Sequence, residues 1–153
     1  NFIDKIFIQK ILPSKLKILA QKTEFMGITF IDGIKYFIGK NEKLIPYNKI
    51  DDNSNLPLIF GKFSISEFLI LNNIFEKNQF EINKIKKYYY HKSKRWDLEF
   101  KDGLLIKLPS KDITKALKIY KIFMLNKKTN IKNKTRIIDL RIPNQVVISH
   151  DKK

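Results

Sequence analysis

The sequence predicts an α+β fold, with a mainly antiparallel β-sheet and two helices packed on one face, preceded by two further strands. Three observations lead to this prediction. Several segments alternate between apolar and polar residues, Asp-Gly turn signals lie between such segments, and two other segments carry apolar residues at helical spacing. The order is strands, helix, strands, helix, strands, with no internal repeat, which is typical of an α+β domain.

The clearest element is a hairpin predicted for residues 95–109. Its first strand alternates, so apolar side chains share one face and the charged side chains between them share the other. The turn is Asp102-Gly103, because glycine takes positive φ without a steric penalty. Pro109 ends the pairing, since proline has no N–H to donate. The residues expected in the core, on this hairpin and on the second helix, are Trp96, Leu98, Phe100, Leu117 and Tyr120. We expect Trp96 to lie beside the second helix.

Two strands open the chain, at residues 2–11 and 15–21, around a turn at 12–14. Their shared apolar face needs a partner to cover it, and we expect a segment upstream to do so. The chain starts at Asn1 rather than at methionine, so we expect it to be a piece of a longer protein. The next predicted elements are strands at 25–31, 34–38 and 44–45, a loop at 46–57 and a short buried segment at 58–60.

Two helices are predicted between the remaining strands. Ser64 followed by Glu67 has the spacing of a capping box, and apolar residues then recur at helical spacing up to Phe75. The second helix is capped by Ser110 or Asp112 and carries apolar residues on one face and lysines on the other. Extended segments are predicted at 80–90, 136–141 and 146–149, with a turn at 143–145.

The formal net charge of +16 suggests nucleic-acid binding as an alternative function. The composition argues against it, because 28 of the 31 basic residues are lysine, whereas base-reading and phosphate-gripping surfaces favour arginine. Residues 88–90 are three tyrosines that resemble a base-stacking platform, but such a run more often forms a strand with alternate rings buried. The basic helix around residues 115–128 resembles a membrane-surface helix, but the sheet needs its apolar face.

No arrangement of residues points to catalysis. Asp97 and Glu99 share a strand face, as the paired acids of a glycosidase do, but the basic residues beside them favour a solvated charged face. His91 and His150 are the chain's only histidines, it has no cysteine, and a metal site needs more ligands than these. The sequence also contains no phosphate-binding loop and no nucleophile elbow. It therefore predicts no enzyme, no metal and no cofactor.

The last predicted strand, at 146–149, is short, β-branched and uncharged. An edge strand usually carries lysine, proline or a bulge that prevents unwanted pairing, and here Pro143 guards only the entry. An unguarded edge is a template for a partner's added strand. We expect Ile142, Val146 and Ile148 to be apolar anchors for the partner. Lys94 and Arg95 are expected to pair with its acidic residues. The full set of residues expected to bind a partner is Lys94, Arg95, Ile142, Asn144, Val146, Val147, Ile148 and Ser149.

Three motifs in order resemble the FtsQ/DivIB family of bacterial cell-division proteins. Residues 11–18 are similar to the turn and strand that close that family's POTRA domain. Residues 94–98, with Gly103 and residues 107–109, are similar to its R-R-W-x-L…G…L-P pattern. Residues 138–144 are similar to its C-terminal V-D-L-R-Y-P pattern, with isoleucine at position 142 in place of tyrosine.

The resemblance implies a non-enzymatic divisome scaffold with one membrane-spanning helix upstream of this chain. No apolar run here approaches the ~20 residues of such a helix. Residues 1–23 would be the last two POTRA strands and residues 24–153 the β domain, on the periplasmic face of the inner membrane. The implied partners are FtsB- and FtsL-like division proteins, bound at the C-terminal edge.

Overall fold

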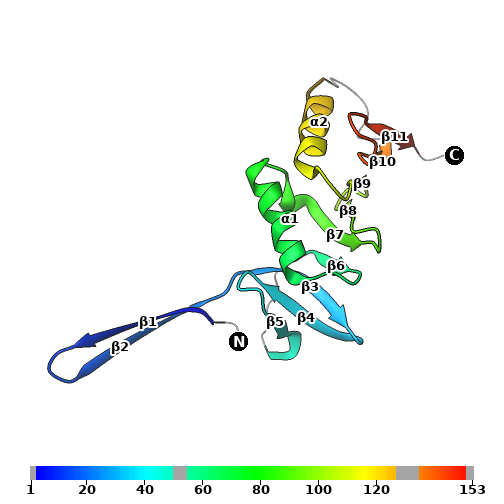
Figure 1. Cartoon of the computed structure of the whole chain (residues 1–153). Helices are drawn as coiled ribbons and strands as arrows, with labels where there is room; N and C mark the ends of the chain where they lie inside the picture. Colours follow the sequence, from blue (N-terminus) through cyan, green and yellow to red (C-terminus); the bar gives the residue numbers. More distant parts are fainter. Residues whose placement is uncertain (1–2, 50–54, 127–134, 151–153) are drawn as a thin grey trace. The chain divides into compact units, whose positions relative to one another are not determined.

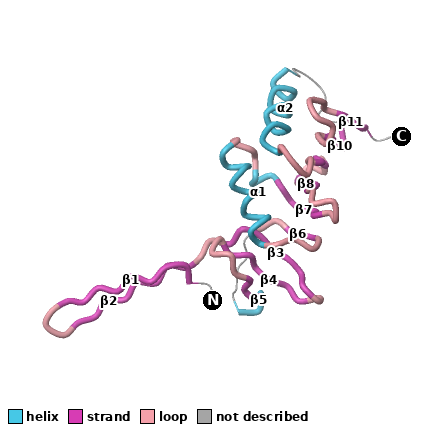
Figure 2. The backbone as a smooth tube through the Cα atoms, in the orientation of Figure 1, coloured by secondary structure: helices cyan, strands magenta, loops and turns pink. Residues whose placement is uncertain are grey.

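The structure, a computed structural model, describes residues 3–49, 55–126 and 135–150. The chain forms two compact units, Asn1–Leu56 and Pro57–Lys153. Figure 1 traces the strands and helices along the chain, and Figure 2 separates helices from strands by colour. The mainly antiparallel sheet with two helices confirms the predicted α+β class.

The first unit consists of strands. They are β1 (Ile3–Ile11), β2 (Lys15–Lys22), β3 (Phe25–Ile31), β4 (Ile34–Gly39) and β5 (Leu44–Pro46), followed by a short 3-10 helix at Tyr47–Lys49. The β1–β2 pair is antiparallel, as are the β3–β4 and β4–β5 pairs. These strands agree with the predicted ones. The 3-10 helix lies in the segment predicted as a loop, part of which is outside the described residues.

The β1–β2 hairpin has an apolar face that the described residues leave exposed. Ile8 pairs directly with Ile18, and the two residues are 65% and 59% exposed. Directly opposed side chains lie on the same face of an antiparallel pair. The expectation that an upstream segment covers this face remains a prediction.

The second unit contains a sheet whose strands run in the order β11-β10-β9-β8-β7-β6. Their bounds are β6 (Leu58–Phe60), β7 (Ile85–Tyr90), β8 (Trp96–Phe100), β9 (Leu105–Lys107), β10 (Thr135–Asp139) and β11 (Val147–His150). The β6–β7 and β9–β10 pairs are parallel, and the other pairs are antiparallel. The extended segment predicted from residue 80 is in part a 3-10 helix, at Ile82–Lys84.

Helix α1 (Ile65–Lys77) starts with the predicted capping box. The Ser64 hydroxyl accepts a hydrogen bond from the Glu67 N–H at 3.2 Å, and the Glu67 carboxylate accepts one from the Ser64 N–H at 2.9 Å. Helix α2 (Ile113–Asn126) follows Asp112, whose carbonyl oxygen accepts hydrogen bonds from the N–H groups of Lys115 and Ala116. Of the two predicted caps, Asp112 is therefore the residue that starts this helix.

Replacing Ser64 with alanine is expected to lower the free energy of unfolding by about 1 kcal/mol, because the N–H of Glu67 loses its acceptor. Hydrogen bonds from the Ser64 N–H, the Tyr90 hydroxyl and the Ser64 hydroxyl lower the pKa of Glu67. The alanine variant loses the last of these, in which the Ser64 hydroxyl donates to the Glu67 carboxylate at 2.9 Å. A lowered pKa in the folded state stabilises the protein above the ordinary pKa of glutamate, and this stabilisation is lost as the pH falls. Urea titrations at pH 7 and pH 3.5 should show a smaller difference between parent and variant at the lower pH; an equal difference would contradict this account.

The helices cover one face of the second unit's sheet. Tyr88, Leu98, Ile106 and Ile138 oppose one another across four strands, and all are buried on this face. The Phe68 ring on α1 lies 5.3 Å from that of Tyr88. On the same face, the ring of Phe80 links Phe100 on β8 to Tyr120 on α2. Burial raises the pKa of Tyr120 to about 12.

Trp96 is buried among aromatic rings. Its indole lies 4.7 to 6.2 Å from four rings and contacts α1 through Phe68. These four rings belong to Phe63, Phe68, Tyr88 and Tyr90. The expectation that Trp96 also lies beside the second helix remains a prediction. Phe100 is a hairpin residue that is linked to α2, through the ring of Phe80.

Candidate partner-binding edge

Strand β11 lies at one end of the sheet, and among the strands that the structure describes only β10 pairs with it. The strand predicted at 146–149 is thus found one residue later, at Val147–His150. Its outer side presents main-chain groups that no described strand uses. Such an edge is the kind of surface that accepts an added strand.

The hydrogen bonds of the neighbouring strands show which groups face outward. The Leu140 N–H donates to the Lys107 carbonyl at 2.9 Å, so the main-chain groups of Leu140 face β9. Main-chain groups alternate in direction along a strand, so those of Asp139 face β11. Asp139 pairs with Val147, whose groups therefore face β10. It follows that the N–H and C=O of Ile148 point away from the sheet.

The side chains of β11 alternate between the two faces. Ile148 pairs with the buried Ile138 and lies on the helix side, where it is half-buried. Val147 is 41% exposed on the opposite face, and Ser149 is exposed. Among the other predicted contact residues, Ile142 is 47% exposed, Val146 is half-buried, and Asn144 is exposed with φ of 62°.

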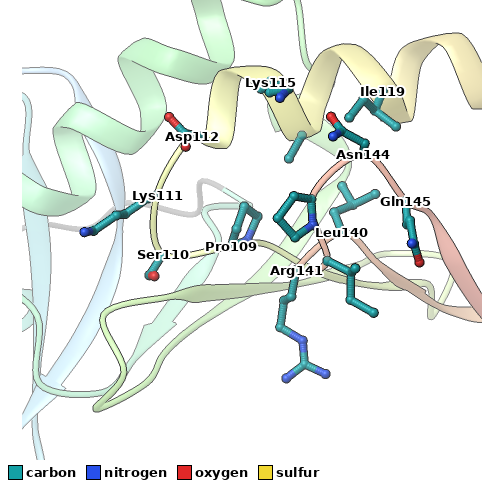
Figure 3. A pocket seen from close by; sticks show the side chains of 13 residues that line it. Pro109, Ser110, Lys111, Asp112, Lys115, Ile119, Leu140, Arg141, Asn144 and Gln145 are labelled. Atoms are coloured by element: carbon teal, nitrogen blue, oxygen red, sulfur yellow. The ribbon is translucent and has the colours of Figure 1, made fainter.

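A pocket of about 240 Å³ lies where α2 starts and the chain leads into β11. Figure 3 shows Lys115 and Ile119 on the part of α2 next to the segment that leads into β11. The Arg141 side chain extends away from the helix. The pocket is lined by Pro109, Ser110, Lys111, Asp112, Lys115, Ala116, Ile119, Leu140, Arg141, Ile142, Pro143, Asn144 and Gln145. Thus two predicted contact residues, Ile142 and Asn144, line this pocket together with residues of α2.

Arg141 was not singled out by residue patterns, although it belongs to the C-terminal motif. Its Nε donates to both carboxylate oxygens of Asp139, at 2.8 and 2.9 Å. These hydrogen bonds lower the pKa of Asp139 and raise that of Arg141. Arg141 is therefore held beside the edge by its own strand, and the charge of Asp97 also raises its pKa.

Asp97 is buried, so the prediction of a solvated charged face is wrong at this residue. Its side chain is 8% exposed, one carboxylate oxygen lies 2.9 Å from His91 Nε2, and the other lies 3.6 Å from Arg95 Nε. Neither Arg95 Nε nor that second oxygen has a hydrogen-bond partner, although both are buried. The side chains of His91 and Arg95 therefore lie against the Asp97 carboxylate.

Glu99, the other acid of this face, is half-buried and accepts a hydrogen bond from the Tyr89 hydroxyl at 2.6 Å. This hydrogen bond is the largest cause of the lowered pKa of Glu99. Lys87 donates to the same carboxylate at 3.2 Å. Both acids therefore have partners within the β7–β8 hairpin. Of the two predicted cationic contacts, Lys94 is exposed, whereas Arg95 is half-buried beside Asp97.

Within the described ranges, no helix is long and apolar enough to cross a membrane. In the same part of the chain, no three His, Cys, Asp or Glu side chains gather in a way that would hold a metal ion.

Comparison with known proteins shows which family this chain resembles. A family model described as cell division protein FtsQ/DivIB, C-terminal, matches residues 31–141. Cell division protein FtsQ of Rickettsia bellii is 30% identical over 149 residues, which are 97% of this chain and 55% of that protein. Cell division protein FtsQ of Rhizobium meliloti is 20% identical over 118 residues, 77% of this chain and 38% of that protein. This chain thus spans about half the length, or less, of these curated relatives. It belongs to the FtsQ/DivIB family of cell-division proteins.

Proposed function

We propose that this chain is a non-catalytic scaffold of the bacterial divisome that binds FtsB- and FtsL-like partners by strand addition at β11 and so supports septum formation. It works on the periplasmic face of the inner membrane, held by a helix upstream. Residues 1–23 are the last two strands of a POTRA domain, and residues 24–153 are the β domain. The observation that carries the proposal is the outer side of β11, with which no strand among the described residues pairs.

The edge has the chemistry that strand addition needs. Residues 146–149 contain no charge and no proline, so nothing on the strand blocks a second ladder. Each main-chain hydrogen bond contributes roughly 1 kcal/mol net, so four or five offset only part of the cost of association. Side-chain anchors are therefore also needed.

The anchors lie on both faces of the edge. A partner side chain on the helix side lies next to Ile148, and one on the opposite face lies next to the exposed Val147. The exposed Ile142 continues the apolar surface into the pocket beside α2. Acidic residues of the partner are expected to pair with Lys94, which is exposed, and with Arg95.

Ile148→Pro tests the proposal, because it removes an N–H that faces the partner and leaves the inner ladder intact. Ile148→Ala is the matched control, since it loses the same side chain but keeps the N–H. Calorimetric titration with the periplasmic segments of the FtsB- and FtsL-like proteins should show binding about tenfold weaker for the proline variant than for the alanine variant. Far-UV circular dichroism confirms that both variants are folded.

Equal affinities of the two folded variants would show that the partner does not use this edge. Proline at Val147 is a poorer test, because the Val147 N–H faces β10 and its loss would break the β10–β11 pair. Unchanged binding by Ile148→Pro, Ile148→Ala and Ile142→Ser alike would exclude the whole C-terminal surface.

A further inference from the structure

The outer face of α2 carries apolar side chains that the sheet does not bury. Ala116 and Leu117 are buried, as expected for the side of the helix that faces the sheet. Ile122 and Leu125 lie outside that side and are 59% and 72% exposed. They are three positions apart on the helix (i and i+3), so they are neighbours on its surface and form one narrow apolar ridge. Large apolar side chains gathered on a monomer's surface mark an interaction site more often than isolated ones do.

Lysines surround this ridge. Lys115, Lys118 and Lys121 are exposed, and α2 contains no acidic residue. Among the residues that the structure describes, no ion pair involves any of these three lysines. The face therefore combines apolar contact area with positive charge that is available to a partner.

A hollow of about 220 Å³ adjoins the ridge on the side away from β11. It is lined by Asn78, Gln79, Phe80, Glu81, Phe100, Leu117, Tyr120, Lys121, Met124 and Leu125. The rings of Phe80 and Tyr120, 5.8 Å apart, are among its apolar walls, and Lys121 and Leu125 join it to the outer face of the helix. The only acid in the lining, Glu81, is already paired with Lys84.

We propose that the outer face of α2 and this hollow form a second docking surface, which binds an acidic amphipathic helix of a partner protein. One apolar side chain of that helix fills the hollow, others pack on Ile122 and Leu125, and its acidic residues pair with Lys118 and Lys121. Packing at i, i+3 and i+4 spacing is how an amphipathic helix binds an apolar surface. This surface is separate from β11 and does not depend on strand addition there.

The geometry favours a helix over a lipid surface. An interfacial helix needs a broad apolar face to enter the headgroup region, and here the exposed apolar residues form only a narrow ridge. A discrete hollow lined by aromatic rings suits a single side chain, which a bilayer does not present. The lysines fit either partner, so they do not decide between them.

The probe is a labelled helical peptide of about 20 residues, with leucine at i, i+3, i+4 and i+7 and glutamate on the flanks. A scrambled peptide of the same composition controls for the general attraction of a +16 chain to anything acidic. Fluorescence anisotropy at about 150 mM salt should show the amphipathic peptide binding at least about tenfold more tightly than the scrambled one. Leu125→Asp should abolish this preference.

Lys118→Glu combined with Lys121→Glu should weaken binding of the amphipathic peptide. Lys101→Glu combined with Lys111→Glu changes the net charge by the same amount, at exposed lysines outside α2. This double variant should keep the preference for the amphipathic peptide. Ile148→Pro should bind the peptide as the parent does, which separates this surface from the β11 edge. Trp96 emission, which reports on the buried core, checks that each variant is folded.

Two results would overturn the proposal. One is equal binding of the amphipathic and scrambled peptides by the parent chain. The other is a dependence on Leu125 for binding to vesicles but not for binding to the peptide. If Leu125→Asp abolished binding to phosphatidylglycerol vesicles, phosphatidylcholine vesicles did not bind, and the variant still bound the peptide, the surface would be assigned to an anionic membrane.

Discussion

Replacing Trp96 with alanine is expected to lower the free energy of unfolding by about 3–5 kcal/mol. The side chain is 4% exposed and lies against the rings of Phe68 on α1 and of Tyr90 on β7. Its removal leaves a cavity where helix and sheet meet, and the aromatic rings around it cannot close that cavity without losing their own contacts. Urea denaturation followed by far-UV circular dichroism measures the loss, because the variant has no tryptophan to report on.

Trp96→Phe is the control and should retain most of the stability, since it keeps an aromatic ring between the helix and the sheet. Partner binding by Trp96→Ala should weaken only in proportion to the unfolded fraction. A Trp96→Ala variant as stable as the parent, but unable to bind FtsB- or FtsL-like partners, would instead make Trp96 a contact residue.

The sequence predicted the helices and strands of this fold better than it predicted which of them pack against one another. Alternation and turn residues located the strands, and the Ser64–Glu67 spacing located α1, because these signals act over a few residues. Alternation also placed Trp96 on the buried face. It did not say which helix covers that residue, since this depends on how the strands are ordered, and the parallel β6–β7 and β9–β10 pairs leave no local signal.

Burial of Asp97 was missed for a related reason. A charged residue between apolar ones normally faces water, as the alternation of β8 indicates. Here His91 and Arg95, which lie on either side of the β7–β8 turn, fold back over the carboxylate. Arg95 shares the face of Asp97 by alternation, whereas the register of the hairpin brings His91 onto that face.

For the candidate edge, the sequence indicated the strand but not which of its main-chain groups point outward. The hydrogen bonds of β10 with β9 determine which β11 groups face outward, and these bonds join segments that α2 separates in sequence. The exposed Ile122 and Leu125 were not singled out, although at 100° per residue they fall on the lysine side of α2, away from Ala116 and Leu117. Helical periodicity could therefore have found them.

Replacing Gly61 with alanine is expected to lower the free energy of unfolding by about 3 kcal/mol, for two reasons that add. Gly61 has φ of 108°, a conformation that residues with a Cβ adopt only at a cost of about 1–2 kcal/mol. A Cβ at this position would also lie 2.2 Å from the Tyr90 carbonyl oxygen. That atom belongs to the end of β7, so relief of the overlap requires a shift of the backbone where β6 and β7 lie side by side.

Gly33→Ala separates the two contributions. Gly33 also has positive φ, 78°, but a Cβ there would meet no atom within 4 Å, so its replacement should lower the free energy of unfolding by only about 1–2 kcal/mol. Urea denaturation of both variants, each compared with the parent, measures the difference. Both sites have a positive φ, so a larger loss at Gly61 points to the overlap with the Tyr90 carbonyl oxygen. If the two variants lose equal stability, the β6–β7 junction relaxes freely, and the close approach of Gly61 to Tyr90 does not constrain the fold.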